Sequence, residues 1–319
     1  MNTQDKIGVL LLNLGGPERL EDVRPFLFNL FSDRQIIRLG PAFLQKTIAR
    51  IIAHRRAPKS MANYQRIGGG SPIRLRTEEQ AAALERALQG DGSFVVRPCM
   101  RYWHPFADEA LREMAAAKVD RLIALPLYPH YSIATTGSSL TDLRRTLARM
   151  GLRLPVREID SWPIEPQYVA SLVARIKEGV GGFAGQPVQV VYSAHSLPVQ
   201  FIREGDPYVR HLEQTIRAVE EATGVPGRLC YQSRSGPVEW LGPALPEVIE
   251  ELAKQGCINM LVVPISFVSD HVETLYEIDI QYREMAEGLG IRFAATRALN
   301  DDPSFIAALR SLVLANLAV

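Results

Sequence analysis

Residues 259–284 change within one segment from the pattern of a buried strand to that of a helix. The apolar run from Met260 to Pro264 has the length and bulk of a buried strand, and a helical pattern begins after Phe267. The change falls on the polar residues 269–273. Open α/β sheets bind their ligands at this point, where a parallel strand ends and its helix begins. The segment therefore predicts a parallel strand–helix unit with a functional site at the end of the strand.

The helix expected after this strand carries a row of polar side chains. Intervals of four, four and three residues place on one helix face Glu273, Glu277, Gln281 and Glu284. Neighbouring carboxylates repel one another, so such a row favours a bound cation or proton. Two structural interpretations compete with this one: Ser269 or Asp270 caps the helix, with Glu273 in a capping pair, and Glu277 is simply solvated.

The same alternation of strand and helix runs along the chain and predicts a doubly wound parallel α/β fold. Residues 121–143 and 259–278 resemble each other locally, since both run from a strand through proline, an aromatic residue and serine into a helix. We therefore expect two related lobes with a cleft between their strand ends. Residues 1–155 form the first lobe, joined by a C-terminal helix at 303–319, and residues 156–302 form the second. Residues 157–162 are expected to cross between them.

Composition narrows the class of protein. A chain of 319 residues that is 47% hydrophobic can form two cored domains, and a net charge of +1 provides no field for nucleic acid. Cys99, Cys230 and Cys257 are far apart and form no C-x-x-C pair, which favours reduced thiols over a structural zinc or iron–sulfur site. The N-terminal residues do not match a secretory signal, and no apolar run is long enough to span a bilayer. We expect a cytoplasmic protein.

Residues 54–73 combine basic side chains with a glycine loop. Arg55, Arg56, Lys59 and Arg66 precede the three glycines 68–70. Guanidinium groups and exposed backbone N–H groups suit a carboxylate or a phosphate. The alternative is a glycine hinge on a solvated basic surface.

Two histidines follow strands in the second half of the chain. His195 and His271 come just beyond the carboxyl ends of two expected strands, and Glu273 lies beside His271. These nitrogen and oxygen donors suit a divalent first-row metal or acid–base chemistry. A lone histidine is more often structural, but two of them with a carboxylate are less often accidental. A hydrolase built on Ser193 and His195 is disfavoured, because G-x-S-x-G is absent and no orienting acid is evident.

Eight motifs in order along the chain resemble those of the ferrochelatase family. They are NLGGPE at Asn13, YQRIGGGSPI at Tyr64, RYWHP at Arg101, TTGSSL at Thr135, SAHSLP at Ser193, GDPY at Gly205, WLGP at Trp240 and SDHVETLYEID at Ser269. The resemblance implies a lyase-class metal chelatase of haem biosynthesis, which inserts Fe²⁺ into protoporphyrin IX and releases two protons. It also implies two Rossmann-like lobes, each a four-stranded parallel sheet flanked by helices, with the macrocycle in the cleft.

The resemblance assigns roles to the residues at the cleft. His195 and Glu273 face each other at the metal-insertion site and serve as metal ligands and catalytic groups. We expect His195 to accept a pyrrole proton and Glu273, helped by His271, to act on the metal side, although the sequence leaves the reverse assignment open. Glu277 continues the row as a proton or metal conduit. The family often has a further acid where this chain has Gln281.

The resemblance also implies the residues that bind the porphyrin. The propionate groups are expected to meet four residues, namely Arg56, Lys59, Tyr64 and Ser71. Tyr102 and Trp240 are expected to press on the ring, and Arg101 to brace the inner cleft.

Cofactor and partners follow from the same resemblance. We expect no permanently bound cofactor, because Fe²⁺ is a substrate, and no [2Fe–2S] cluster, because the sequence lacks the C-terminal cysteine cluster of some relatives. The dimerising extension that accompanies this cluster is missing too, so we expect a monomer. Porphyrin and Fe²⁺ are the expected partners, and peripheral contact with a membrane is allowed. Alternative functions are a coproporphyrin ferrochelatase, a cobalt-inserting tetrapyrrole chelatase, and a carrier that binds porphyrin or metal without turnover.

Overall fold

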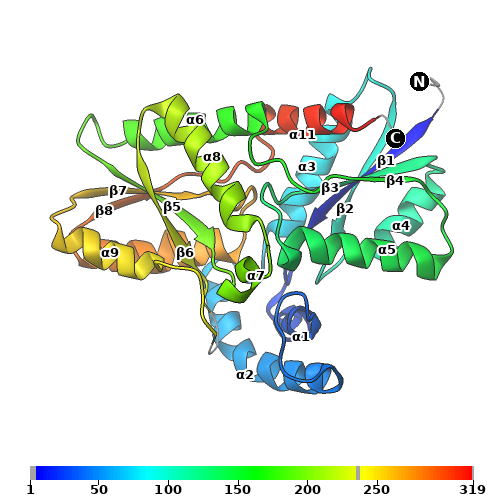
Figure 1. The fold of residues 1–319 in the computed structure, drawn as a ribbon, viewed down its shortest axis with the longest axis horizontal. Coiled ribbons are helices and arrows are strands. Elements are labelled where there is room, and N and C mark those ends of the chain that lie inside the picture. The colour runs from blue at the N-terminus through cyan, green and yellow to red at the C-terminus, as the bar shows by residue number, and fades with distance from the viewer. Residues whose placement is uncertain (1–4, 235–237, 318–319) are drawn as a thin grey trace. The chain divides into compact units, whose positions relative to one another are not determined.

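The structure, a computed structural model, describes residues 5–234 and 238–317 (Figure 1). The chain divides into two compact units. The first unit comprises Met1–Trp162 and Asn300–Val319, and the second comprises Pro163–Leu299.

The first unit is built on a four-stranded parallel sheet with the order β2-β1-β3-β4. Its strands are β1 (Lys6–Asn13), β2 (Ser93–Met100), β3 (Arg121–Pro126) and β4 (Val156–Glu158). Every residue of β1 after Lys6 is buried, as expected for a central strand covered on both faces. β4 pairs with β3 at the edge of this sheet, so the segment expected to cross between lobes begins with a short strand of the first unit.

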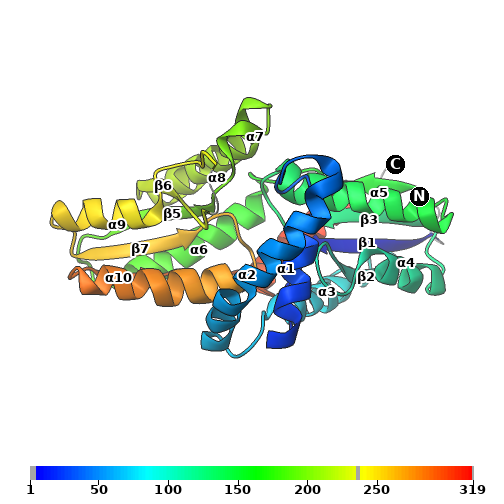
Figure 2. The same cartoon turned by 90° about the horizontal axis from the view of Figure 1, so that it is seen from below.

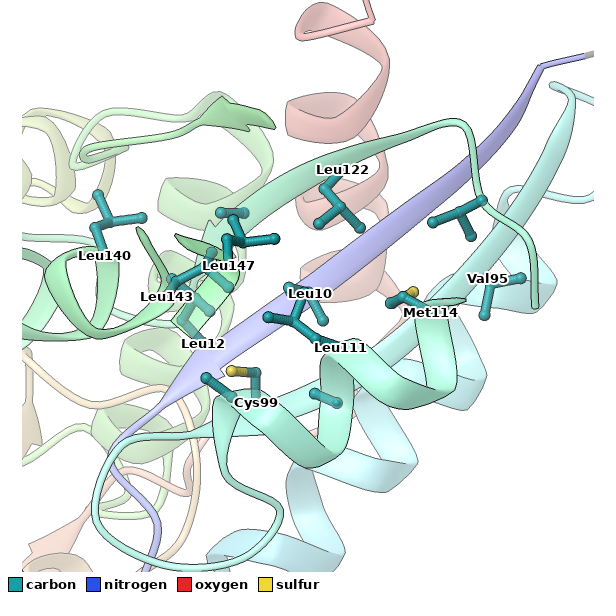
Figure 3. Packing of buried hydrophobic residues seen from close by; sticks show 14 residues of the cluster. Leu10, Leu12, Val95, Cys99, Leu111, Met114, Leu122, Leu140, Leu143 and Leu147 are labelled. Carbon is teal, nitrogen blue, oxygen red and sulfur yellow. The ribbon is translucent and has the colours of Figure 1, made fainter. Parts of the chain in front are cut away.

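Helices cover both faces of this sheet. They are α3 (Ile73–Ala87), α4 (Ala107–Ala116), α5 (Ser138–Met150) and α11 (Pro303–Ala315). Leucines of β1 pack against α4 and α5 in one cluster, which includes Leu10, Leu12, Leu111 and Leu143 (Figure 3). α11 packs beside α3. Two further helices, α1 (Val23–Ser32) and α2 (Gln45–Arg66), pack against each other.

The second unit repeats this arrangement with the sheet order β6-β5-β7-β8 (Figures 1 and 2). Its strands are β5 (Gln189–His195), β6 (Gly227–Gln232), β7 (Asn259–Pro264) and β8 (Arg292–Ala295). Its helices are α6 (Pro166–Gly181), α7 (Val199–Arg203), α8 (Tyr208–Thr223), α9 (Leu245–Lys254), the π-helix η4 (Glu273–Tyr282) and α10 (Arg283–Gly288). α6 packs with α8, and α9 packs with α10. The predicted α/β fold with two four-stranded parallel sheets is confirmed.

β2 ends at Met100, although the N–H groups of Arg101 and Tyr102 still donate to the carbonyls of Asn13 and Leu14 at 2.9 Å. The helix after β7 is a π-helix over its first ten residues. Within the described ranges, no helix is both long enough and apolar enough to cross a membrane.

Candidate active site

The site lies at the carboxyl ends of β5 and β7, which are neighbours in the sheet of the second unit. His195 is the last residue of β5, and Glu273 is the first residue of η4, which follows the loop after β7. The His195 Nδ1 atom lies 2.8 Å from Glu273 Oε2. The fold therefore brings together the histidine and the glutamate predicted from the sequence. Since an ionised carboxylate only accepts, Nδ1 carries the proton of this hydrogen bond.

Ser233 connects this pair to Glu277. Its Oγ atom lies 2.9 Å from Glu273 Oε2 and 2.6 Å from Glu277 Oε2. A hydroxyl has one proton, so it donates to one carboxyl group and accepts from the other only when that group is protonated. Ser233 has a positive φ of 64°, an uncommon conformation for a residue other than glycine. Sequence reasoning missed this residue, although it follows β6 directly and so occupies a strand end beside His195.

Gln232 forms hydrogen bonds with two residues of this arrangement. Its Nε2 atom lies 3.4 Å from Glu277 Oε2, and its Oε1 atom accepts a hydrogen bond from the Ser193 hydroxyl at 2.6 Å. Ser193 is fully buried. It therefore supports the site and is not exposed as a nucleophile would need to be.

The start of η4 bears on the two structural interpretations of its acidic residues. The N-cap residue of this helix is Val272, which provides no side-chain cap. The Glu273 carboxylate instead binds His195 and Ser233, and Glu277 accepts from Ser233. Neither glutamate is explained by capping or by simple solvation. The i→i+5 hydrogen bonds of a π-helix make its turn wider than that of an α-helix, and such turns are frequent at functional sites.

The carboxylates and His195 alter one another's charge. Burial alone would raise the pKa of Glu273, but the facing His195 and its hydrogen bond lower it to about 2. Burial alone would lower the pKa of His195, but Glu273 more than offsets this effect, so the pKa is raised. Burial, followed by repulsion from Glu273, raises the pKa of Glu277 to about 7. Near neutral pH the site thus holds an ionised Glu273 beside a carboxyl group that gains or loses a proton readily.

His271 is oriented as a neutral imidazole. Its Nδ1 atom lies 3.0 Å from the Ser269 carbonyl, which can only accept, so Nδ1 donates. In the neutral ring Nε2 then keeps its lone pair. The Nε2 atom lies 4.0 Å from Glu273 Oε1. Burial lowers the pKa of His271, which favours this neutral form. A backbone carbonyl that fixes the tautomer in this way is typical of metal-binding histidines.

The predicted propionate-binding residues lie on α2 and on the glycine loop of the first unit. Arg56 and Lys59 are exposed on α2, and the Arg56 guanidinium lies over the Phe31 ring at 5.5 Å from its centroid. Tyr64 and Ser71 are buried, with 4% and 9% exposure. The Ser71 N–H donates to the Pro17 carbonyl at 2.7 Å, so this loop packs on the turn that follows β1.

Arg101 and Tyr102 belong to a buried polar network centred on Asp33. The Asp33 Oδ2 atom accepts from the Tyr102 hydroxyl at 2.7 Å and from Arg101 NH2 at 2.9 Å, and Arg101 Nε donates to Ser138 Oγ at 2.7 Å. Tyr102 is only 1% exposed. Burial raises the pKa of Asp33, but the donors around it outweigh this effect and lower it. No sequence signal linked Asp33 to Arg101, Tyr102 or Ser138, because these partners lie far from it along the chain.

Trp240 is the predicted substrate-binding residue of the second unit. It forms an isolated antiparallel bridge with Pro198, which follows the SAHSL residues. Its indole Nε1 is buried and finds no hydrogen-bond acceptor among the described residues. Across those same residues, no group of three or more His, Cys, Asp or Glu side chains is arranged to hold a metal ion.

Comparisons with known proteins identify the family. The Ferrochelatase family model matches residues 6–317. This chain belongs to the ferrochelatase family. It is 58% identical over 307 residues to the ferrochelatase of Desulfotalea psychrophila, covering 96% of each chain. It is 53% identical over 312 residues to the ferrochelatase of Geotalea uraniireducens, covering 97% of each. The predicted membership of the ferrochelatase family is thereby confirmed.

A solved structure agrees with the fold of the ferrochelatase chain. SirB from Bacillus subtilis with Fe³⁺ superposes with a TM-score of 0.60 at 14% sequence identity, covering 98% of this chain and 96% of that chain. At this identity the likeness concerns the fold alone.

Proposed function

We propose that the protein is a ferrochelatase that inserts Fe²⁺ into protoporphyrin IX in the last step of haem biosynthesis. The observation that carries the proposal is the contact of 2.8 Å between His195 Nδ1 and Glu273 Oε2, at adjacent strand ends of a ferrochelatase-family chain. An imidazole and a carboxylate are the groups this reaction needs, because two pyrrole protons must leave as the metal enters. Fe²⁺ is a substrate of this reaction, and no resident cofactor is proposed.

His195 is proposed to accept the two pyrrole protons one after the other, passing on the first before it takes the second. It can do so only as a neutral imidazole, yet Glu273 raises its pKa. The ring must therefore give up any proton it holds before it can accept one from the porphyrin. The hydrogen bonds from Glu273 through Ser233 to Glu277 offer a continuous route for that proton. Glu277, with a pKa of about 7, is suited to take up and release protons near neutral pH.

Glu273 and His271 are proposed to act on the metal side. The ionised carboxylate and the Nε2 lone pair of His271 are oxygen and nitrogen donors that suit a ferrous ion during transfer. His195 is proposed as a third metal ligand once its ring is neutral. Since these donors are few, the porphyrin nitrogens complete the coordination and retain the metal.

The propionate groups are proposed to bind the first unit. Arg56 and Lys59 provide exposed cations on α2, while Tyr64 and Ser71 lie at the end of this helix and on the glycine loop. Guanidinium and ammonium groups favour a carboxylate. The proposal is supported by these cations and not by the loop, because the N–H groups of Gly68, Gly69 and Ser71 already donate to backbone carbonyls. Contact of Tyr102 and Trp240 with the macrocycle, and bracing by Arg101, are proposed on the family resemblance.

Peripheral contact with a membrane is proposed for η2 (Ala42–Leu44) and α2, on a protein that we place in the cytoplasm as a monomer. Phe43 is 81% exposed, Leu44 39% and Ile51 49%. Residues 34–77 contain ten Lys or Arg and no Asp or Glu. An apolar surface within a basic segment favours anionic lipid. Phe43→Asp should reduce co-sedimentation with anionic vesicles, and unchanged sedimentation would contradict the proposal.

The function is tested by spectroscopic assays of metal insertion under anaerobic conditions. Protoporphyrin IX and coproporphyrin are each offered with Fe²⁺ and Co²⁺, and the highest kcat/KM is expected for protoporphyrin with Fe²⁺. A preference for coproporphyrin or for cobalt would support one of the alternative chelatases. Binding without turnover would support the carrier.

Variants of the pair test the mechanism in the same assay. His195→Ala should lower kcat by about 10² to 10⁴-fold, the range for loss of a general base, and Glu273→Gln should also lower it strongly. His211→Ala on α8 is the control and should retain activity. A fully active His195→Ala protein would remove the proposed mechanism.

A further inference from the structure

The GDPY motif at residues 205–208 has no role in the function proposed so far. It follows α7 and leads into α8. Gly205 adopts a positive φ of 97°, and the Asp206 carboxylate accepts the Tyr208 N–H at 3.0 Å. The motif therefore makes a tight turn that fixes the first residue of α8. That residue, Tyr208, is 5% exposed.

The Tyr208 side chain binds the backbone of the proposed general base. Its hydroxyl donates to the His195 carbonyl oxygen at 3.1 Å. The His195 N–H donates to the Ser266 hydroxyl oxygen at 3.0 Å. The peptide groups on both sides of the His195 Cα atom are thus held by side chains, one from α8 and the other from the loop after β7.

These two hydrogen bonds replace a strand partner that His195 lacks on one side. Pairing of β5 with β7 ends at Ser193 opposite Pro264, whereas pairing with β6 continues as far as His195 opposite Gln232. Beyond Ser193 the β7 edge therefore provides no ladder for the His195 peptide groups. On the β6 side the ladder continues, since the Ser196 N–H donates to the Gln232 carbonyl at 2.9 Å, so Tyr208 and Ser266 supply the support that is missing on the β7 side alone.

Rotation of this backbone would matter for the side chain. The N–Cα–C atoms of His195 determine the direction of Cβ, and the ring Nδ1 must meet Glu273 Oε2 at 2.8 Å. Hydrogen bonds weaken steeply as their angle departs from linearity. We infer that Tyr208 is a positioning residue for metal insertion: together with Ser266 it fixes the His195 backbone so that the imidazole stays on Glu273. This inference rests on the proposed role of His195.

Tyr208→Phe tests the inference, because it removes the hydroxyl and keeps the ring. A displacement of about 1 Å of a catalytic group can cost about 10²-fold in rate. We expect kcat to fall by about tenfold to hundredfold, with KM for porphyrin changed by less than about twofold, because the substrate contacts are not altered. A proton NMR signal from the Nδ1–H···Glu273 hydrogen bond should shift or broaden.

Thr215→Val is the matched control. Thr215 is fully buried in the same helix, and its hydroxyl likewise donates to a backbone carbonyl, that of Pro163, at 2.7 Å. It should lose stability to a similar extent and keep kcat and the NMR signal. Ser266→Ala removes the second hydrogen bond and should reproduce the kcat effect even if Tyr208→Phe folds poorly.

The two proposals fail in different ways. An unaltered protein that inserts no metal would refute the proposed function, while the NMR comparison would still test the positioning role. Full kcat and an unmoved signal in Tyr208→Phe would overturn the inference. So would a fall in melting temperature alone, equal to that of Thr215→Val.

Discussion

His195 and Glu273 illustrate how one contact sets the charge of both partners. Each side chain, if buried alone, would favour its neutral form, and each favours the charged form because the other faces it. His271, which lies 4.0 Å from the same carboxylate, remains under the influence of burial, and its pKa is lowered. The two histidines near this glutamate are therefore suited to different roles, His195 to proton transfer and His271 to the metal side.

The first prediction concerns the pH dependence of turnover. If His195 must be neutral to accept a proton, kcat rises with pH through its pKa, and Glu273 places that midpoint above the ordinary value of 6.5. In Glu273→Gln that carboxylate is gone, and only the weaker effect of Glu277 opposes burial. The pKa of His195 should then fall, and the rise should move to lower pH. Residual kcat and an NMR titration of the His195 ring measure this shift; a midpoint that does not move would contradict it.

The second prediction concerns Glu277 and stability. Its folded pKa of about 7 exceeds the ordinary value of 4.5, so the folded state binds more protons between these values. Stability contributed by this residue is therefore lost as the pH rises through that window. Glu277→Gln should raise the free energy of unfolding at pH 8 by about 1–3 kcal/mol and change it little at pH 4.

Denaturant unfolding of Glu277→Gln at both pH values measures this difference. Exposed Glu250 on α9 provides the control, since Glu250→Gln removes the same charge at the surface. An equal effect of the two substitutions, or a gain at pH 4 alone, would show that burial of Glu277 is not the cause.

The residues of the site differ in how far the sequence could indicate them. His195 ends a strand and Glu273 follows one, and ligands bind at strand ends, so the strand–helix pattern indicated them as candidates while the family resemblance assigned their roles. Ser233 also follows a strand, but a serine in a loop carries no special signal. Tyr208 acts through a backbone carbonyl, which no residue pattern records. These roles become visible only when the distances are known.

At the level of elements, two glycine segments of the first unit depend on each other. The loop at residues 68–70 packs on the turn after β1. A Cβ atom on Gly70 would lie 2.0 Å from the Glu18 carbonyl oxygen, and one on Gly16 would lie 2.7 Å from the Ser71 side chain. Both contacts are too close for any other residue. Gly16 and Gly70 are therefore required by packing, which anchors the loop at Gly70. Gly68 and Gly69 have open space around them, and their positive φ of 103° and 95° is what favours glycine there.

Gly70→Ala should consequently disturb both segments. The methyl group meets a backbone atom, which cannot move aside as a flexible side chain would. We expect a loss of about 1–3 kcal/mol in the free energy of unfolding and weaker binding of porphyrin, as judged by a raised KM. Gly181→Ala, at the end of α6 with open space around it, should be neutral or stabilising. Equal effects of the two substitutions would contradict the packing argument.

Short elements were the least predictable from the sequence. β8 has four residues and β4 has three, too few for an alternating pattern to emerge. η4 was expected as an ordinary helix because intervals of four residues fit a wide turn as well as a standard one. The buried strand β7 was predicted well, since its apolar run leaves few other structures available.

At the scale of the whole chain, the two units share one plan. The orders β2-β1-β3-β4 and β6-β5-β7-β8 are the same arrangement, with the first strand of each unit second in its sheet. The local resemblance between residues 121–143 and 259–278 matches this plan, because these segments contain β3 and β7. A π-helical segment follows each, η3 (Ile133–Gly137) in the first unit and η4 in the second.

The second unit is one continuous segment of the chain, whereas the first is made of two segments. The second unit holds both His195 and Glu273, whereas the first needs α11 from the end of the chain. Phe305 in α11 is fully buried, and Arg310 pairs with Asp91 at 2.7 Å. A fragment of residues 163–299 should therefore fold and keep the NMR signal of the pair, without inserting metal. Residues 1–162 should unfold cooperatively only when a peptide of residues 300–319 is added, as circular dichroism would show; a cooperative transition without the peptide would mean that α11 is dispensable to this unit.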